Sequence, residues 1–174
     1  MYISPLKRLL VAAAFSISIT LFLYLPALHN DFVNWDDLVY VTENIHIRTL
    51  NFQSLTWMFT SFEASNWHPV TWLSHSLDIT FFGLNPTWHH FTSIILHVLN
   101  TLLVFLLTHK LFSQAPSDPE IHSKHSLITE TTIASVLTAL LFGIHPLHVE
   151  SVAWVAERKA LLCTFFFPVS VFFS

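Results

Sequence analysis

The sequence predicts an all-α membrane protein, a bundle of several membrane-spanning helices, and three observations support this fold class. Hydrophobic residues make up 53% of the 174 residues and charged residues only 10%, whereas a soluble domain carries ~25% charge. Seventeen residues are Phe and two are Gly. The stretch from Leu9 to Leu28 contains no charge, and a helix of ~20 residues crosses the ~30 Å hydrocarbon core of a bilayer. We therefore expect a first span over residues 9–28.

The basic pair before this stretch sets the expected orientation. Lys7 and Arg8 precede the apolar run, which is longer than the ~7–15 apolar residues of a signal peptide, and no Ala-x-Ala cleavage pattern follows it. We expect an uncleaved helix whose N-terminus lies in the cytoplasm by the positive-inside tendency. Residues 29–90 then form a long external loop.

The external loop has the pattern of helices that lie at the membrane surface. Asn51 is a suitable N-cap for apolar residues that recur at helical spacing up to Phe62. Pro69 suits the first turn of a second helix, which Gly83 ends. Five of the six tryptophans fall between residues 35 and 88, as expected for a segment at headgroup level.

Further spans are expected at 91–112 and 127–144. A fourth, at 161–174, is expected to be incomplete because the chain stops there, and Pro168 interrupts its apolar pattern. His97 and Asn100 lie inside the expected span at 91–112. Hydrogen bonding between helices is the favoured role for both, with a direct functional role as the alternative. Residues 113–130, with two prolines and mixed charges, are expected to form a cytoplasmic loop. This organisation predicts the N-terminal part of a larger membrane domain.

Residues 146–159 are amphipathic, and Pro146 suits a first helical turn. The pattern predicts one short interfacial helix on the outer side. Arg158 and Lys159 at its end are the adjacent basic pair expected on that side.

Several motifs in order resemble one family across nearly the whole chain, apart from the loop around Pro116. They are Asp31-Phe-Val-Asn-Trp-Asp-Asp37, Asn66-Trp-His-Pro-Val-Thr-Trp-Leu-Ser-His-Ser-Leu-Asp78, Phe82-Gly-Leu-Asn-Pro86, residues 90–107, and Leu141-Phe-Gly-Ile-His-Pro-Leu-His-Val-Glu-Ser-Val-Ala-Trp-Val-Ala-Glu-Arg-Lys159. This succession resembles the N-terminal membrane part of the bacterial TPR-containing relatives of protein O-mannosyltransferases.

That resemblance implies a helical enzyme of the GT-C glycosyltransferase type in the bacterial inner membrane. Such enzymes take a sugar from a polyprenyl-phosphate carrier and attach it to a protein or glycan acceptor at the outer face. It also implies further spans and C-terminal TPR repeats that this chain lacks, so the 174-residue chain alone is expected to be inactive.

By match of the motif, the resemblance implies that Asp36 or Asp37 is the catalytic base. A carboxylate can take the proton of an attacking acceptor hydroxyl, and repulsion between neighbouring acids shifts the pKa of one of them. We favour Asp37 as the base, with Asp36 orienting it or binding the acceptor. A cap of a turn or helix and a divalent-cation site remain the alternatives, and no other cofactor is expected.

The donor phosphate needs positive charge, and Arg158 and Lys159 are the first candidates, because Arg binds phosphate in a bidentate manner. The alternative is that both side chains reach the lipid headgroups or pair with Glu157. Arg48 is the reserve candidate.

Four further polar residues are expected to contact the acceptor or to shape the site: His68, His145, His148 and Glu150. The spacing of His145, His148 and Glu150 differs from the i, i+4 histidine pair of zinc proteases, so no metal site is predicted there. Hydrogen bonds that fix the local turn are the favoured role for these three, with acceptor contact second. For His68 and His75, packing beneath the active site is favoured.

Two function classes remain after these observations. The first is a polyprenyl-phosphate-dependent glycosyltransferase, and the second is a non-catalytic membrane scaffold or anchor. Nucleic-acid binding is set aside, because the net charge is −4 and the seven basic residues form no stripe. Cys163 is the one cysteine in the sequence, so a disulfide framework and a cysteine-based metal motif are excluded.

Overall fold

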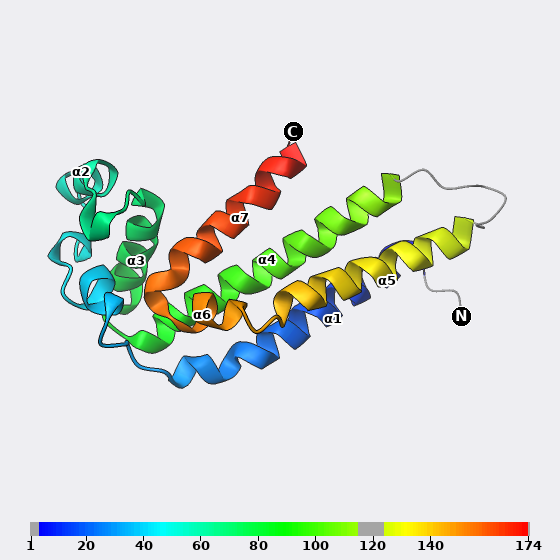
Figure 1. Ribbon diagram of the computed structural model, residues 1–174, viewed down its shortest axis with the longest axis horizontal. Coiled ribbons are helices and arrows are strands. Elements are labelled where there is room, and N and C mark those ends of the chain that lie inside the picture. The colour runs from blue at the N-terminus through cyan, green and yellow to red at the C-terminus, as the bar shows by residue number, and fades with distance from the viewer. Residues whose placement is uncertain (1–3, 115–123, 174) are drawn as a thin grey trace.

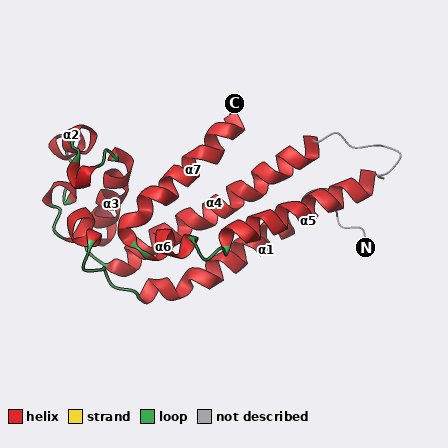
Figure 2. Ribbon diagram, viewed as in Figure 1, coloured by secondary structure: helices red, strands yellow, loops and turns green. Residues whose placement is uncertain are grey.

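A computed structural model describes residues 4–114 and 124–173, and every regular element in these ranges is helical (Figures 1 and 2). Long helices form a bundle, and short helices gather at one end of it. The expected all-α class is confirmed for this part of the chain.

The bundle is built around α4, Pro86–Gln114, which packs against α1, Pro5–Tyr24, α5, Lys124–Gly143, and α7, Arg158–Phe173. Residues 5–29, formed by α1 and the short helix η1, Leu25–His29, and residues 86–114 are each long and apolar enough to cross a membrane. The apolar part of α5 is shorter, at 129–143, and α7 has 16 residues and remains helical across Pro168. All four expected spans are therefore helical, and two of them meet the length of a span. The expected cytoplasmic loop includes residues 115–123, which lie outside the described residues, as do His122 and the side chain of His125.

The loop predicted to lie outside folds into a small helical unit at one end of the bundle, named the external unit after that prediction (Figure 1). Its elements are η2, Leu38–Thr42, η3, Ile45–Ile47, α2, Phe52–Thr60, η4, Glu63–Ser65, and α3, Pro69–Phe82. Asn51 caps α2 through its side chain, which accepts from the Ser54 amide, while Ser54 bonds back to Asn51. Gly83 ends α3 with φ of +67°, a conformation that glycine adopts without strain. The two helices predicted in this loop are confirmed.

The segment after the third span differs from the predicted single helix. It forms α6, His148–Ala153, and the short helix η5, Val155–Glu157, and Arg158 begins α7. Trp154 is extended, with φ −109° and ψ 119°, and breaks the helix. The Ala156 amide donates to Asp37 and not to a carbonyl of a continuing helix. The prediction was wrong here because a long-range hydrogen bond outweighed the local amphipathic pattern.

Polar groups inside the bundle tie helices together, as predicted. A ring nitrogen of His97 contacts the Gly143 carbonyl at 2.9 Å, and the Asn100 side chain donates to the Leu161 carbonyl at 3.0 Å. At Gly143 a Cβ atom would lie 2.4 Å from the hydroxyl of Thr20 and 2.9 Å from that of Thr101, so a larger residue would force side chains to shift where α1, α4 and α5 meet. These contacts fix the helices that meet beneath the external unit.

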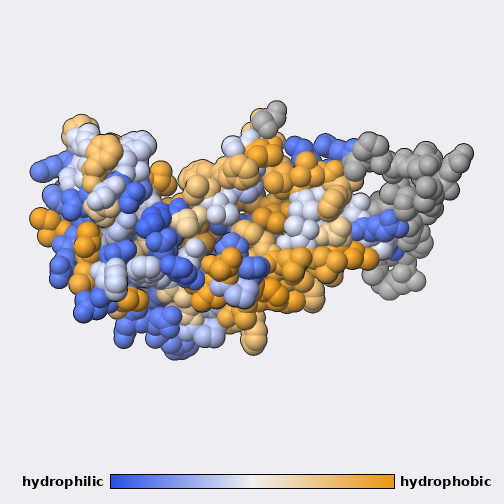
Figure 3. Space-filling model, in the orientation of Figure 1, coloured by the Kyte–Doolittle hydropathy of each residue, from blue (hydrophilic) through white to orange (hydrophobic). Residues whose placement is uncertain are grey.

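Hydropathy separates the two ends of the molecule (Figure 3). Hydrophobic residues cover most of the visible face of the bundle, and hydrophilic residues are more frequent toward the end that carries α2 and α3. One buried cluster, which includes Tyr40, Met58, Trp72 and Val155, lies within the external unit and joins η5 to it. The 155–157 segment is thus part of the core of the external unit.

Candidate functional site

Asp37 joins the first loop to the segment before α7. Its side chain is fully buried, and one carboxylate oxygen accepts from the Ala156 amide at 2.8 Å, while the other accepts from the Val33 amide at 2.8 Å. Burial raises the pKa of Asp37, as does the neighbouring Asp36, whereas these two hydrogen bonds and the nearby His90 act in the opposite direction. Asp37 therefore has the geometry of the structural cap that the sequence left as an alternative.

Asp36 differs from its neighbour in exposure and in contacts. Its side chain is half-buried, and within residues 4–114 and 124–173 no hydrogen bond or ion pair to its carboxylate is recorded. An oxygen without a protein donor can accept a proton or a hydrogen bond from a substrate. The acid pair thus contains one residue held by the protein and one that remains available.

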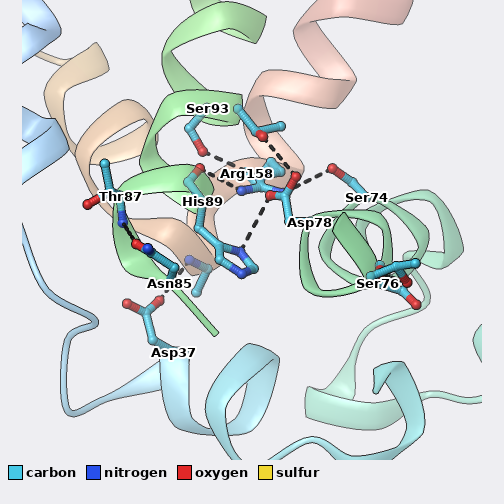
Figure 4. A network of polar contacts seen from close by, with 12 residues as sticks. Asp37, Ser74, Ser76, Asp78, Asn85, Thr87, His89, Ser93 and Arg158 are labelled. Carbon is cyan, nitrogen blue, oxygen red and sulfur yellow. Dashed lines mark hydrogen bonds and ion pairs between the residues drawn. The ribbon is translucent and has the colours of Figure 1, made fainter. Parts of the chain in front are cut away.

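Arg158 is fully buried and contacts α3 and α4 with its whole guanidinium group (Figure 4). Its Nη1 lies 2.6 Å from an Asp78 oxygen and 3.1 Å from the Ser74 hydroxyl. Its Nη2 donates to the His89 carbonyl at 2.7 Å, and its Nε donates to the Ser93 hydroxyl at 3.3 Å. Because protein groups occupy these donors, the geometry opposes the expected contact of Arg158 with the donor phosphate.

Lys159 follows directly and points to a different environment. Its side chain is 32% exposed, its Nζ pairs with Glu157 at 2.9 Å, and it lies over the Tyr40 ring at 5.1 Å from the centroid. The pairing with Glu157 was one of the alternatives, and the partial exposure leaves Lys159 able to meet an anionic ligand. Arg48, the reserve candidate, donates to the Thr42 carbonyl within the external unit.

The histidines of the predicted site separate into two groups. The ring of His68 stacks on Tyr40 at 5.2 Å and lies 4.6 Å from the ring of Trp72, so it packs within the external unit. His145 is exposed and accepts from the Leu147 amide at 3.2 Å, which fixes the turn before α6. His148 lies against Phe142 at 4.5 Å between ring centroids. Glu150 is exposed on α6.

Asp78 and His89 were not predicted as site residues, although Asp78 ends one of the motifs quoted above and His89 directly precedes another. Oδ1 of Asp78 accepts from the Thr92 hydroxyl at 2.8 Å, while Oδ2 pairs with Nη1 of Arg158 at 2.6 Å and also lies 3.5 Å from Nδ1 of His89. A single acid within the apolar sequence 69–82 was the available signal, because a buried acid requires a partner.

The site therefore has two linked parts at one end of the bundle. The Asp37 cap joins the acid pair to Ala156, and two residues later the Arg158 network anchors the start of α7 to α3 and α4. Asp36 and Lys159, in contrast to Asp37 and Arg158, are only half-buried. The sequence predicted that the acids and the basic pair would lie at the same end, and the Asp37 to Ala156 contact agrees with that placement.

Comparisons with known proteins bear on what this site does. The chain is 34% identical over 107 residues to human protein O-mannosyl-transferase TMTC4 and 30% identical over 102 residues to human protein O-mannosyl-transferase TMTC1. A Drosophila melanogaster protein O-mannosyl-transferase, Tmtc1, is 29% identical over 96 residues.

These alignments cover 60%, 59% and 55% of this chain but only 14%, 10% and 9% of the three relatives. No protein-family model and no solved structure matches the chain. Over this part of its length the chain is a distant homologue of protein O-mannosyl-transferases.

Proposed function

We propose that this chain supplies the acceptor-activating part of a membrane glycosyltransferase that moves a sugar from a polyprenyl-phosphate donor to a protein acceptor. The names of the homologues support mannose as the sugar and protein as the acceptor. The single observation that supports the site assignment is the unequal environment of the two acids. Asp37 is held by two amides, and Asp36 beside it is not.

In the proposed reaction, Asp36 is the general base and Asp37 is a positioning residue, which reverses the roles favoured by the sequence. The acceptor hydroxyl oxygen forms a bond to the anomeric carbon, and its proton passes to Asp36. The bond from that carbon to the phosphate oxygen breaks, and the polyprenyl phosphate leaves with the electron pair. Lys159 stabilises the negative charge on the leaving phosphate as a mobile point charge.

A radioactive transfer assay tests this function. A longer protein that carries this region, in membranes supplied with radiolabelled mannosyl polyprenyl phosphate, is expected to label a protein acceptor. The same membranes supplied with a nucleotide-linked mannose and no polyprenyl carrier are the matched control. If no label reaches protein from either donor, while the protein is present and folded, the scaffold function replaces the proposal.

The proposed orientation places the N-terminus in the cytoplasm and the external unit on the periplasmic or extracellular side. Gln53 on α2 and Gln114 at the end of α4 are both exposed and lie at opposite ends of the bundle. In a Cys163→Ser background, an impermeant thiol reagent added to intact cells is expected to label Gln53→Cys and not Gln114→Cys.

Both cysteine variants should react after the cells are opened, which controls for the reactivity of each position. Labelling of Gln114→Cys alone in intact cells would show the opposite orientation. The site would then face the cytoplasm, and a donor presented at the outer face would be excluded.

A further inference from the structure

A buried group of three metal-binding side chains lies beside the Arg158 network. His75 and Asp78 stand three residues apart on α3 and so share one face of that helix, while His89 comes from the first turn of α4. One potential ligand atom from each residue lies within 4.8 Å of the others, and all three residues are buried. We propose that His75, Asp78 and His89 bind a divalent transition-metal ion, with zinc as the ion that fits this ligand set.

The spacing of the ligand atoms is close to that of a zinc site. Two ligands of a tetrahedral zinc ion lie roughly 3.3 Å apart, because each lies about 2.0–2.1 Å from the metal. Nδ1 of His89 is 3.5 Å from Oδ2 of Asp78. The two groups already have this spacing, and a ring nitrogen of His75 lies within 4.8 Å of both.

The unpartnered ring of His75 is a second observation, independent of the spacing, that points to a ligand. Its side chain is fully buried, and neither ring nitrogen has a hydrogen-bond partner within the described residues. Buried polar atoms are almost always bonded to protein, water or an ion, because an unpartnered one is costly. A metal ion between His75 and the other two residues would accept a lone pair from one of these nitrogens.

The charges in this region also leave room for a cation. Asp37 and Asp78 are both buried, and Arg158 is the one buried lysine or arginine among the described residues. The negative charge of Asp37 lies near enough to Arg158 to stabilise its positive charge. Imidazole binds metals in its neutral form. With neutral histidines, the two carboxylates exceed the positive charge by one.

The types of ligand and the other partners of Asp78 determine which ion fits the site and where the ion lies. Two imidazole nitrogens with one carboxylate favour zinc over magnesium or calcium, which prefer oxygen ligands. Asp78 also binds Arg158 and Thr92, and such outer partners commonly orient a ligating carboxylate. The three ligands are buried and the ion shares the Asp78 carboxylate with Arg158, so we expect an ion that joins α3 to α4, with a buried water as the fourth ligand of tetrahedral zinc.

Metal analysis of the chain purified in detergent tests the proposal. With an affinity tag free of histidine and no chelator, mass spectrometry of the metals is expected to find about one zinc ion per chain. His75→Asn and His89→Asn should lower bound zinc by roughly tenfold or more. His145→Asn, which changes an exposed histidine, is the matched control and should retain zinc.

Cobalt substitution keeps the test decisive if the variants fail to fold. Unmodified chain stripped of zinc and loaded with Co²⁺ should show the visible absorption of a tetrahedral site, with X-ray absorption detecting two imidazole ligands. If folded chain contains no zinc after exposure to buffered zinc, the proposal is wrong, and ordered water is the partner of His75. The proposal is also wrong if His145→Asn lowers the amount of bound zinc as much as His75→Asn does.

Discussion

The substitution Asp78→Asn is expected to cost about 3–5 kcal/mol in the free energy of unfolding, because it leaves the buried Arg158 without its counter-charge. The guanidinium would retain Ser74, Ser93 and the His89 carbonyl, none of which carries a negative charge. Unfolding by denaturant in a mild detergent measures the loss. Zinc should be removed by a chelator in all samples, so that the loss of a metal ligand does not add to the loss of the ion pair.

A double substitution is the matched control for this pair. Replacing both charges by apolar groups, as in Asp78→Leu with Arg158→Met, removes the unpaired charge and should cost clearly less than Asp78→Asn alone. Glu63→Gln, at an exposed acid of η4, should leave the free energy of unfolding unchanged. If Asp78→Asn costs no more than Glu63→Gln, the ion pair does not anchor α7 to α3.

The substitution Asp36→Asn is expected to lower sugar transfer by ~10²–10⁴-fold, because it preserves the size of the side chain and removes its ability to accept a proton. The assay uses a longer protein that carries this region, with a polyprenyl-phosphate donor. Initial rates should be expressed per folded molecule, since only then does a loss of rate report on catalysis. The free energy of unfolding should change little, because no contact to the Asp36 carboxylate is recorded among the described residues.

Asp37→Asn provides the contrasting variant. An asparagine offers one carbonyl oxygen where the carboxylate bonds both the Val33 and Ala156 amides, so one buried amide loses its acceptor at a cost of ~1–3 kcal/mol. We expect less folded protein and a smaller effect on the rate per folded molecule than for Asp36→Asn. Equal rates for Asp36→Asn and the parent protein would disprove the base assignment, and a larger rate loss for Asp37→Asn would restore the roles favoured by the sequence.

The sequence by itself determined the helices and their ends wherever the signal was local. The capping pair at Asn51, the start of α3 at Pro69 and its end at Gly83 follow from backbone chemistry within a few residues. The uncharged run at 9–28 likewise predicted a long apolar helix, because the length of a span is fixed by the bilayer. The hydrogen bonds made by His97 and Asn100 were also expected, since polar groups inside a span need partners.

Only the tertiary structure decided which charges are used within the protein. In the sequence, nothing local distinguishes Asp36 from its neighbour Asp37, or Arg158 from its neighbour Lys159. The fold buries Asp37 and Arg158 and leaves the other two half-buried. The break at Trp154 follows from the same cause, because the Ala156 amide bonds a carboxylate 119 residues earlier in the chain. A local pattern contains no information on such distant partners, and the cost of burying an unpaired charge or amide is what selects them.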